Sequence, residues 1–294
     1  MCAKSQFPYT PLRLLWDGFN PAGFEQGNFV IFRGYIDESY DANQNVFALS
    51  CLIARGKTWY EMERKWKLHL AAKNKQLLKA GRPTISRYHA SDCSGRRNEF
   101  DGWSHEERDS FVRGLFRILK QAPVHTVVFD VQLDEVCEVF PEWSKDRIET
   151  AYNVLTGFLM YMIGEDFEKI PRPHAMYWKD SKITLFHDRT GGNGRYDPAI
   201  LRVFNQQMGD PEFPYRKWFT TIAPMSWEDC IALQPADLVA FECFKEAEAR
   251  IEARKSRKSF KALLDMAAFG IHSKGFDKES LLKMRAHLAG YRDV

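Results

Sequence analysis

Two adjacent carboxylates, Asp37 and Glu38, close an otherwise apolar segment near the start of the chain. Residues 29–36 are rich in β-branched and aromatic side chains, which predicts a strand, and residues 39–45 are typical of a turn. Because side chains alternate along a strand, Asp37 should share a face with Tyr35, and Glu38 should point to the other face. At most one of the two can lie squarely in a site on a given face. The plainer interpretation is that the pair opens a solvated hairpin turn.

Further acids lie at strand ends and on an apolar helix face. Asp188 ends the segment ITLFHD, and Asp130 lies near the end of HTVVFDV. Asp237 shares helical spacing with Phe241 in LQPADLVAFECF, where an unpaired carboxylate would be costly to bury. It therefore needs a cation, a basic partner or an exit to water. Since Pro235 marks the start of this helix, we expect Asp237 in its first turn, where the helix dipole also favours an acid.

Carboxylates that converge from strand ends and a helix favour hard divalent cations. Mg²⁺ and Mn²⁺ prefer carboxylate and water oxygens. The six cysteines are far apart and include no C-x-x-C pair, so neither a zinc site nor a disulfide framework is indicated. Two divalent ions about 4 Å apart can activate a water and stabilise the leaving oxygen at phosphorus. The acids thus predict divalent-metal-dependent phosphodiester hydrolysis, which is nuclease chemistry.

Helix-capping patterns indicate the elements that must position these acids. Four helix starts are expected, at Thr58-x-x-Glu61, Ser104-x-x-Glu107, Asp146-x-x-Glu149 and Asp197-Pro198. Strands are expected at residues 29–37, 46–54, 87–90, 125–131 and 183–188. A hairpin followed by alternating helices and strands predicts an α/β protein, with a mixed sheet flanked by helices.

Length and composition indicate one large globular domain with appendages. The chain has 294 residues, of which 45% are apolar and 14% aromatic, and its net charge is only +3. We expect an N-terminal extension (residues 1–28), the α/β domain (residues 29–248) and a C-terminal helical tail (residues 249–294). The first residues lack the apolar core of a signal peptide, and no segment resembles a membrane span, so we expect a soluble, cytoplasmic protein.

A basic run near the C-terminus is the candidate nucleic-acid contact. Residues 250–261, RIEARKSRKSFK, contain six basic residues and one acid. They are either a solvated helix end or a contact to the phosphate backbone, made through Arg254, Lys255, Arg257 and Lys258.

Four motifs, YIDES, YHASD, FHDRTGG and LQPADLVAF, together resemble the bacterial and phage family called domain of unknown function 3800. Its members carry an F-x-D-E-S-G strand end, a histidine motif and a Q-x-A-D helix, and the similarity covers about residues 30–248. The resemblance implies a ribonuclease-H-like fold, a superfamily that includes Holliday-junction resolvases and transposases. It implies that Asp37, Asp188 and Asp237 are metal ligands, with Glu38 as a motif member only and Asp130 as the alternative middle acid.

Two further residues bear on the resemblance. His89 of YHASD, together with Asp92, can orient a water or bind phosphate, or it can simply satisfy nearby hydrogen bonds. Tyr40 stands where the family has glycine after D-E-S, and its ring could narrow the cleft or contact a base.

Three functions remain open at this level. The first is a Mg²⁺- or Mn²⁺-dependent nuclease of DNA or RNA. The second is a catalytically inactive ribonuclease-H-like interaction module in a phage-defence or mobile-element system, with a second copy or a regulatory protein as its partner. The third is phosphate-ester hydrolysis of a nucleotide.

Overall fold

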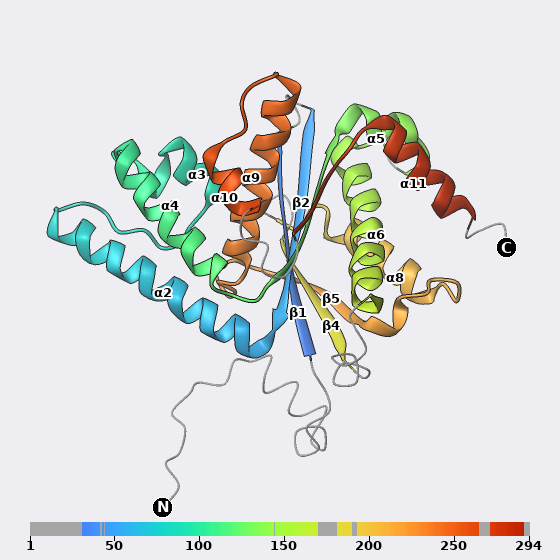
Figure 1. The fold of residues 1–294 in the computed structure, drawn as a ribbon, viewed down its shortest axis with the longest axis horizontal. Helices are drawn as coiled ribbons and strands as arrows, with labels where there is room; N and C mark the ends of the chain where they lie inside the picture. The colour runs from blue at the N-terminus through green and yellow to red at the C-terminus, as the bar shows by residue number, and fades with distance from the viewer. Residues whose placement is uncertain are drawn as a thin grey trace, which may run out of the picture.

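The computed structural model describes residues 31–41, 43, 45–143, 145–169, 181–189, 193–264 and 271–290. The expected N-terminal extension, residues 1–28, lies outside these ranges. The described chain forms a six-stranded sheet between two layers of helices (Figure 1). The strands are β1 (Ile31–Asp41), β2 (Val46–Arg55), β3 (His125–Gln132), β4 (Lys182–Asp188), β5 (Phe219–Met225) and β6 (Ile271–Phe276). Their order across the sheet is β5-β4-β1-β2-β3-β6.

The sheet is mixed, which confirms the predicted α/β class. β2 runs antiparallel to its neighbours β1 and β3. The pairs β1–β4, β4–β5 and β3–β6 are parallel. The carboxyl ends of β1 and β4 therefore reach the same edge of the sheet side by side.

Each face of the sheet is covered by its own set of helices (Figure 1). One face packs against α2 (Gly56–Lys79), α3 (Ala90–Gly95), α4 (His105–Lys120), α9 (Leu233–Ile251) and α10 (Lys258–Leu264). The other packs against α5 (Leu133–Val139), α6 (Arg147–Glu168), α8 (Asp197–Gly209) and α11 (Lys278–Gly290). Short 3₁₀ turns occupy Asn98–Phe100 and Arg216–Trp218. Along β1, Tyr35 belongs to the core on the α9 face and Ile36 to the core on the α6 face, as alternation predicts.

Two of the predicted helix caps form as expected. The Ser104 hydroxyl accepts the Glu107 amide at the start of α4, and the Asp146 carboxylate accepts two amides at the start of α6. α8 starts at Asp197 with a proline in its first turn, as expected, but its N-cap residue is Tyr196 and no side chain caps it. The prediction at Thr58 is wrong, because α2 already begins at Gly56, directly after β2, with no side-chain cap.

The structure differs from the sequence reasoning at three further places. Residues 87–90 are not a strand but an irregular segment leading into α3. β5 and β6 are not anticipated, since neither has a long apolar run. The tail, residues 249–294, is not purely helical: α9 continues through its predicted boundary, and β6 adds an edge strand to the sheet.

Among the described residues, no helix combines the length and the apolar character that crossing a bilayer requires.

Candidate functional site

Asp37 and Asp237 are brought together by the packing of α9 on the first hairpin. Asp37 lies opposite Ser50 in the β1–β2 register. The buried Ser50 hydroxyl donates a hydrogen bond of 2.9 Å to the backbone oxygen of Ala236. The next residue along α9 is Asp237, so one buried hydrogen bond joins the neighbours of both carboxylates. This places acids 200 positions apart at one edge of the sheet.

Asp188 enters the same region from β4. The parallel β1–β4 pairing runs up to Ile36 opposite His187, so Asp37 and Asp188 follow side by side where this pairing ends. β4 ends at Asp188, whereas β1 continues to Asp41 beside β2, so Asp37 does not open a turn as the plainer interpretation expected. The Asp188 carboxylate accepts the Arg189 amide at 2.9 Å. His187 points to the opposite face, where its ring lies 3.8 Å from Asp197 of α8. This alternation agrees with the expectation for a regular strand.

Glu38 lies on the other face of β1 from Asp37, as predicted. It faces α6, where the buried hydroxyl of Tyr152 interacts with it. Tyr40 is on this face as well and stacks on Phe47 at 5.7 Å between ring centroids, so its side chain does not stand in front of Asp37. The Tyr40 ring thus packs on the face opposite Asp37.

Asp37, Glu38, Asp188 and Asp237 lie close enough for their charges to raise the pKa of one or more of the others. Burial raises the pKa of Asp37 well above its ordinary value, and the charges of Asp237, Glu38 and Asp188 raise it further. Burial also raises the pKa of Glu38 to about 7, and the charges of Asp188 and Asp237 add to this. The pKa of Asp237 rises to about 6, mainly through burial. Carboxylates that destabilise one another in this way attract a cation.

Asp237 does not occupy the first turn of α9. The helix begins at Leu233, and no acid lies in its first turn, so the expected interaction with the helix dipole is wrong. The Asp237 carboxylate instead accepts the Ala90 amide at 2.7 Å at the start of α3. One of its oxygens is thereby committed to holding the YHASD segment.

The YHASD and QPAD motifs fold as one unit. The side-chain oxygen of Gln234 accepts two buried hydrogen bonds, from the Trp66 indole at 2.9 Å and from the Tyr88 amide at 3.0 Å. With the Asp237–Ala90 bond, this fixes the segment that carries His89 beside the acids. His89 is 38% exposed at its side chain, is paired with Asp92 at 2.8 Å, and lowers the pKa of Asp237 by its charge.

Replacing Gln234 by methionine should detach this segment. The change keeps the volume but leaves the Trp66 indole and the Tyr88 amide without an acceptor, which we expect to lower the free energy of unfolding by about 2–4 kcal/mol. Urea denaturation followed by circular dichroism measures the loss. The exposed Gln76 of α2 provides the control. Equal stability of the Gln234→Met and Gln76→Met variants would show that the hydrogen bonds do not hold the segment.

Asp130 is not part of the group. It lies two strands away on β3, opposite Ala48. Its carboxylate pairs with Arg250 and accepts from the Cys243 thiol at 3.6 Å. Burial raises the pKa of Asp130, and Arg250 counteracts the shift. The two candidates for the middle acid therefore separate, and Asp188 is the one that lies with Asp37 and Asp237.

Arginines of the basic run, residues 250–261, form ion pairs within the protein. Arg254 pairs with Glu252 at 2.5 Å, and Arg257 pairs with Glu242 of α9 at 3.2 Å. Lys255 and Lys258 are exposed. Two of the four predicted nucleic-acid contacts, Arg254 and Arg257, therefore already have acidic partners within the protein.

Sequence reasoning missed one cation at the site. Arg87, just before the histidine motif, stacks on the ring of Trp227 with 3.7 Å between its guanidinium carbon and the ring centroid. Its charge lowers the pKa values of Asp188 and Asp237. The arginine next to YHASD was the available signal, but assigning residues 87–90 to a strand concealed it.

The donor chemistry suits a hard cation, but the side-chain positions do not form a complete site. Within the described ranges, no group of three or more His, Cys, Asp or Glu side chains is arranged to hold a metal ion. Carboxylate oxygens are the ligands that Mg²⁺ and Mn²⁺ prefer. Ion binding would therefore require these side chains to turn toward one another.

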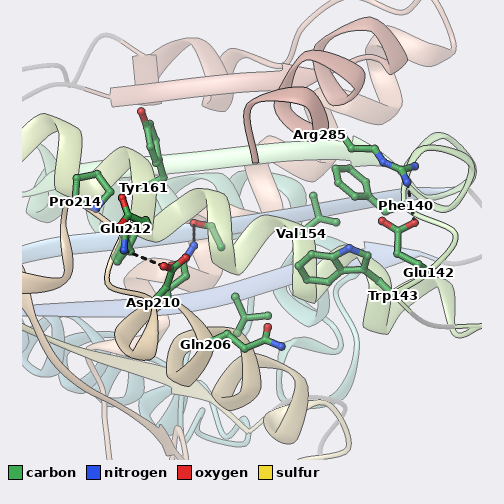
Figure 2. A pocket seen from close by; sticks show the side chains of 14 residues that line it. Phe140, Glu142, Trp143, Val154, Tyr161, Gln206, Asp210, Glu212, Pro214 and Arg285 are labelled. Carbon is green, nitrogen blue, oxygen red and sulfur yellow. Dashed lines mark hydrogen bonds and ion pairs between the residues drawn. The ribbon is translucent and has the colours of Figure 1, made fainter. Parts of the chain in front are cut away.

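A cavity of about 400 Å³ lies away from the acids, on the face covered by α6 and α8 (Figure 2). Most of its wall is apolar and aromatic, including Trp143 and Tyr161. Glu142 and Arg285 form an ion pair of 3.3 Å at one side (Figure 2). None of the four carboxylates lines this cavity.

Comparison of the chain with protein-family models, with curated proteins and with solved structures finds no match.

Proposed function

We propose that the protein is a divalent-metal-dependent nuclease with a ribonuclease-H-like fold, and that Asp37, Asp188 and Asp237 bind Mg²⁺ or Mn²⁺. One observation carries the proposal: acids from two neighbouring strands and a helix meet in one buried region, where burial first, and then the charges of the neighbouring acids, raise their pKa values. Such an arrangement costs stability, and a bound cation would relieve the repulsion. The mixed sheet flanked by helices is compatible with this fold.

Separate residues of the chain would bind the cation, position the water and bind the substrate phosphate. Asp37, Asp188 and Asp237 would bind the cation, and His89, held by Asp92, would position a water or a phosphate oxygen. Arg87 on Trp227 would bind the substrate phosphate. The bound ion would supply an activated water and stabilise charge at phosphorus.

Cleavage of a nucleic-acid panel tests the proposal. Labelled single- and double-stranded DNA and RNA are incubated with Mn²⁺ or Mg²⁺, and at least one should be cut. Calorimetric titration with Mn²⁺ tests ion binding separately. Cleavage that persists in EDTA, or in Asp37→Asn, would remove the assignment.

Replacing Arg87 by alanine should change metal and phosphate binding in opposite directions. Removing a cation beside Asp188 and Asp237 should tighten Mn²⁺ binding about five- to tenfold, equivalent to about 1 kcal/mol. Binding of inorganic phosphate to the Mn²⁺-loaded protein should weaken. Calorimetry measures both affinities, and Arg97→Ala, an exposed arginine 3.9 Å from Asp92, serves as control. A shift of both affinities in the same direction would indicate a structural role for Arg87.

A catalytically inactive interaction module is the second candidate. The cavity beside α6 favours it, because a cavity with a mostly apolar and aromatic wall could hold a ligand or a partner side chain away from the acids. The incomplete convergence of the acids favours it too. Absence of Mn²⁺ binding by calorimetry, together with an intact fold, would support this candidate over the nuclease.

A further inference from the structure

Helix α2 has a marked excess of basic residues. α2 carries seven Lys or Arg residues and two Glu residues in its 24 positions, whereas the whole chain has a net charge of only +3. The bases are spread along its sequence rather than gathered in a run. Only the helical repeat brings them onto a common surface.

One side of α2 is fixed in the core. Trp59, Met62, Trp66, Leu70 and Leu77 are buried on this side. Lys73 also points inward, where it pairs with Glu107 of α4 at 2.5 Å. In Figure 1, α2 forms the lower left edge of the molecule with α4 above it, so its opposite side is the outer surface.

The outer side carries five exposed cations and one exposed acid, Glu61, which lies 4.0 Å from Lys57. The other four cations, Arg64, Lys67, Lys75 and Lys79, are what we call the α2 stripe. All four are exposed, and within the described part of the chain none of them forms an ion pair of 4.0 Å or less, although the charge of Lys67 lowers the pKa of Glu63 against the raising effect of burial. With 3.6 residues per turn, they lie within about a third of the helix circumference, and the first and last are about 22 Å apart along the axis. Leu68 and Leu78 lie between them, 58% and 66% exposed.

We infer that the α2 stripe binds the phosphate backbone of nucleic acid. A row of unpaired cations on a rigid helix matches a polymer that carries a negative charge at every nucleotide, and each contact releases counterions. Because the helix is held by its buried aromatic side, the cations are positioned before binding.

An anionic membrane fits the stripe less well. A helix that lies in a bilayer surface buries its apolar face in the lipid. The apolar face of α2 is already buried in the protein core, and the two exposed leucines are separated by cations. The C-terminal basic run is also a weaker candidate, since Arg254 and Arg257 have acidic partners.

This inference is independent of the carboxylates, because backbone binding requires no metal and no cleavage. Binding of a labelled duplex in EDTA therefore tests the stripe, while Mn²⁺ titration tests the acids. A negative result for the stripe does not contradict the metal site, and a negative result for the metal site does not contradict the stripe.

A matched pair of triple variants provides the experiment. Lys67→Gln, Lys75→Gln and Lys79→Gln are combined in one protein, and Lys255→Gln, Lys258→Gln and Lys261→Gln in the other, so that both lose the same charge. Glutamine has nearly the helix propensity of lysine, so α2 should persist. Fluorescence anisotropy with labelled DNA and RNA duplexes between about 50 and 200 mM salt gives the dependence of affinity on salt.

In the α2 variant, the slope of log affinity against log salt concentration should become shallower by about 2–3. In the variant that lacks Lys255, Lys258 and Lys261, this slope should change less. Equal slopes for wild type and the α2 variant would overturn the inference. So would salt-dependent binding of wild type to phosphatidylserine vesicles without binding to either duplex.

Discussion

Asp37→Asn should abolish metal-dependent cleavage and Mn²⁺ binding while it increases the stability of the metal-free protein. Asp37 is 9% exposed, and burial raises its pKa, with a further rise from the charges of Asp237, Glu38 and Asp188. Removing its charge should relieve that repulsion. In the proposed reaction, the same change removes a metal ligand, and metal stabilisation of several kcal/mol corresponds to at least about 10²–10³ in rate.

The opposite directions of the two effects separate a site residue from a structural one. A carboxylate that only supports the fold would lose activity and stability together. Cleavage rates, Mn²⁺ calorimetry and urea denaturation in EDTA measure the three quantities on the same protein samples.

Asp130→Asn is the matched control. Asp130 is also a buried acid near a strand end, but it pairs with Arg250 and lies two strands away. The Arg250 side chain is 54% exposed, so it should remain hydrated when its partner is lost. This variant should keep its cleavage activity. If Asp130→Asn abolishes cleavage while the protein stays folded, Asp130 rather than Asp188 is the middle acid.

The sequence predicts the individual acids better than it predicts their surroundings. Strand alternation correctly places Asp37 and Glu38 on opposite faces, because that property depends only on local geometry. The choice between Asp130 and Asp188 depends on strand order. Both acids follow similar apolar segments, and only the sheet shows that β4 lies next to β1 whereas β3 lies beyond β2.

Interactions between distant segments could not be read from the sequence. The Gln234 side chain joins Trp66 and Tyr88 from two other parts of the chain, so no local pattern reveals it. The same reason explains the missed strand β6, which has few apolar residues and forms by pairing with β3. The two basic surfaces illustrate this. The basic run at residues 250–261 is contiguous in the sequence, whereas the cations of the α2 stripe are adjacent only once the helix has formed.

Metal-free protein should become less stable as the pH rises from about 4.5 to about 7. A raised pKa means that the folded state holds its proton at a pH where the unfolded chain has released it. Stability is therefore greatest below the unfolded pKa and falls as the pH rises toward the folded pKa. For Glu38 this interval runs from its ordinary pKa of 4.5 to about 7, and for Asp237 from 3.8 to about 6. A shift of this size corresponds to roughly 3 kcal/mol for one such group, and coupled groups do not add fully.

Other titratable groups also make the stability depend on pH, and their contributions must be subtracted. Burial lowers the pKa of His187, which makes stability rise with pH up to its ordinary value. Asp92 is hydrogen-bonded to His89, and Glu107 to Lys73 and Arg82, and these bonds lower the pKa values of the two acids. Their contribution to stability therefore changes with pH only below about pH 4.5. A double variant, Asp37→Asn with Glu38→Gln, keeps all three of these groups. The difference between its pH profile and that of wild type therefore isolates the acids.

Urea denaturation across this pH range, first in EDTA and then with Mn²⁺, measures the effect. In EDTA, wild type should lose several kcal/mol relative to the double variant between about pH 4.5 and pH 7. Excess Mn²⁺ at pH 7 should restore wild type by about 2.7 kcal/mol at a hundredfold excess over the dissociation constant, and should not affect the double variant. Parallel profiles in EDTA would falsify the mutual repulsion on which the proposed site depends. A difference in EDTA that Mn²⁺ leaves unchanged would instead retain the repulsion and reject the metal, because the acids would then be strained without holding a cation.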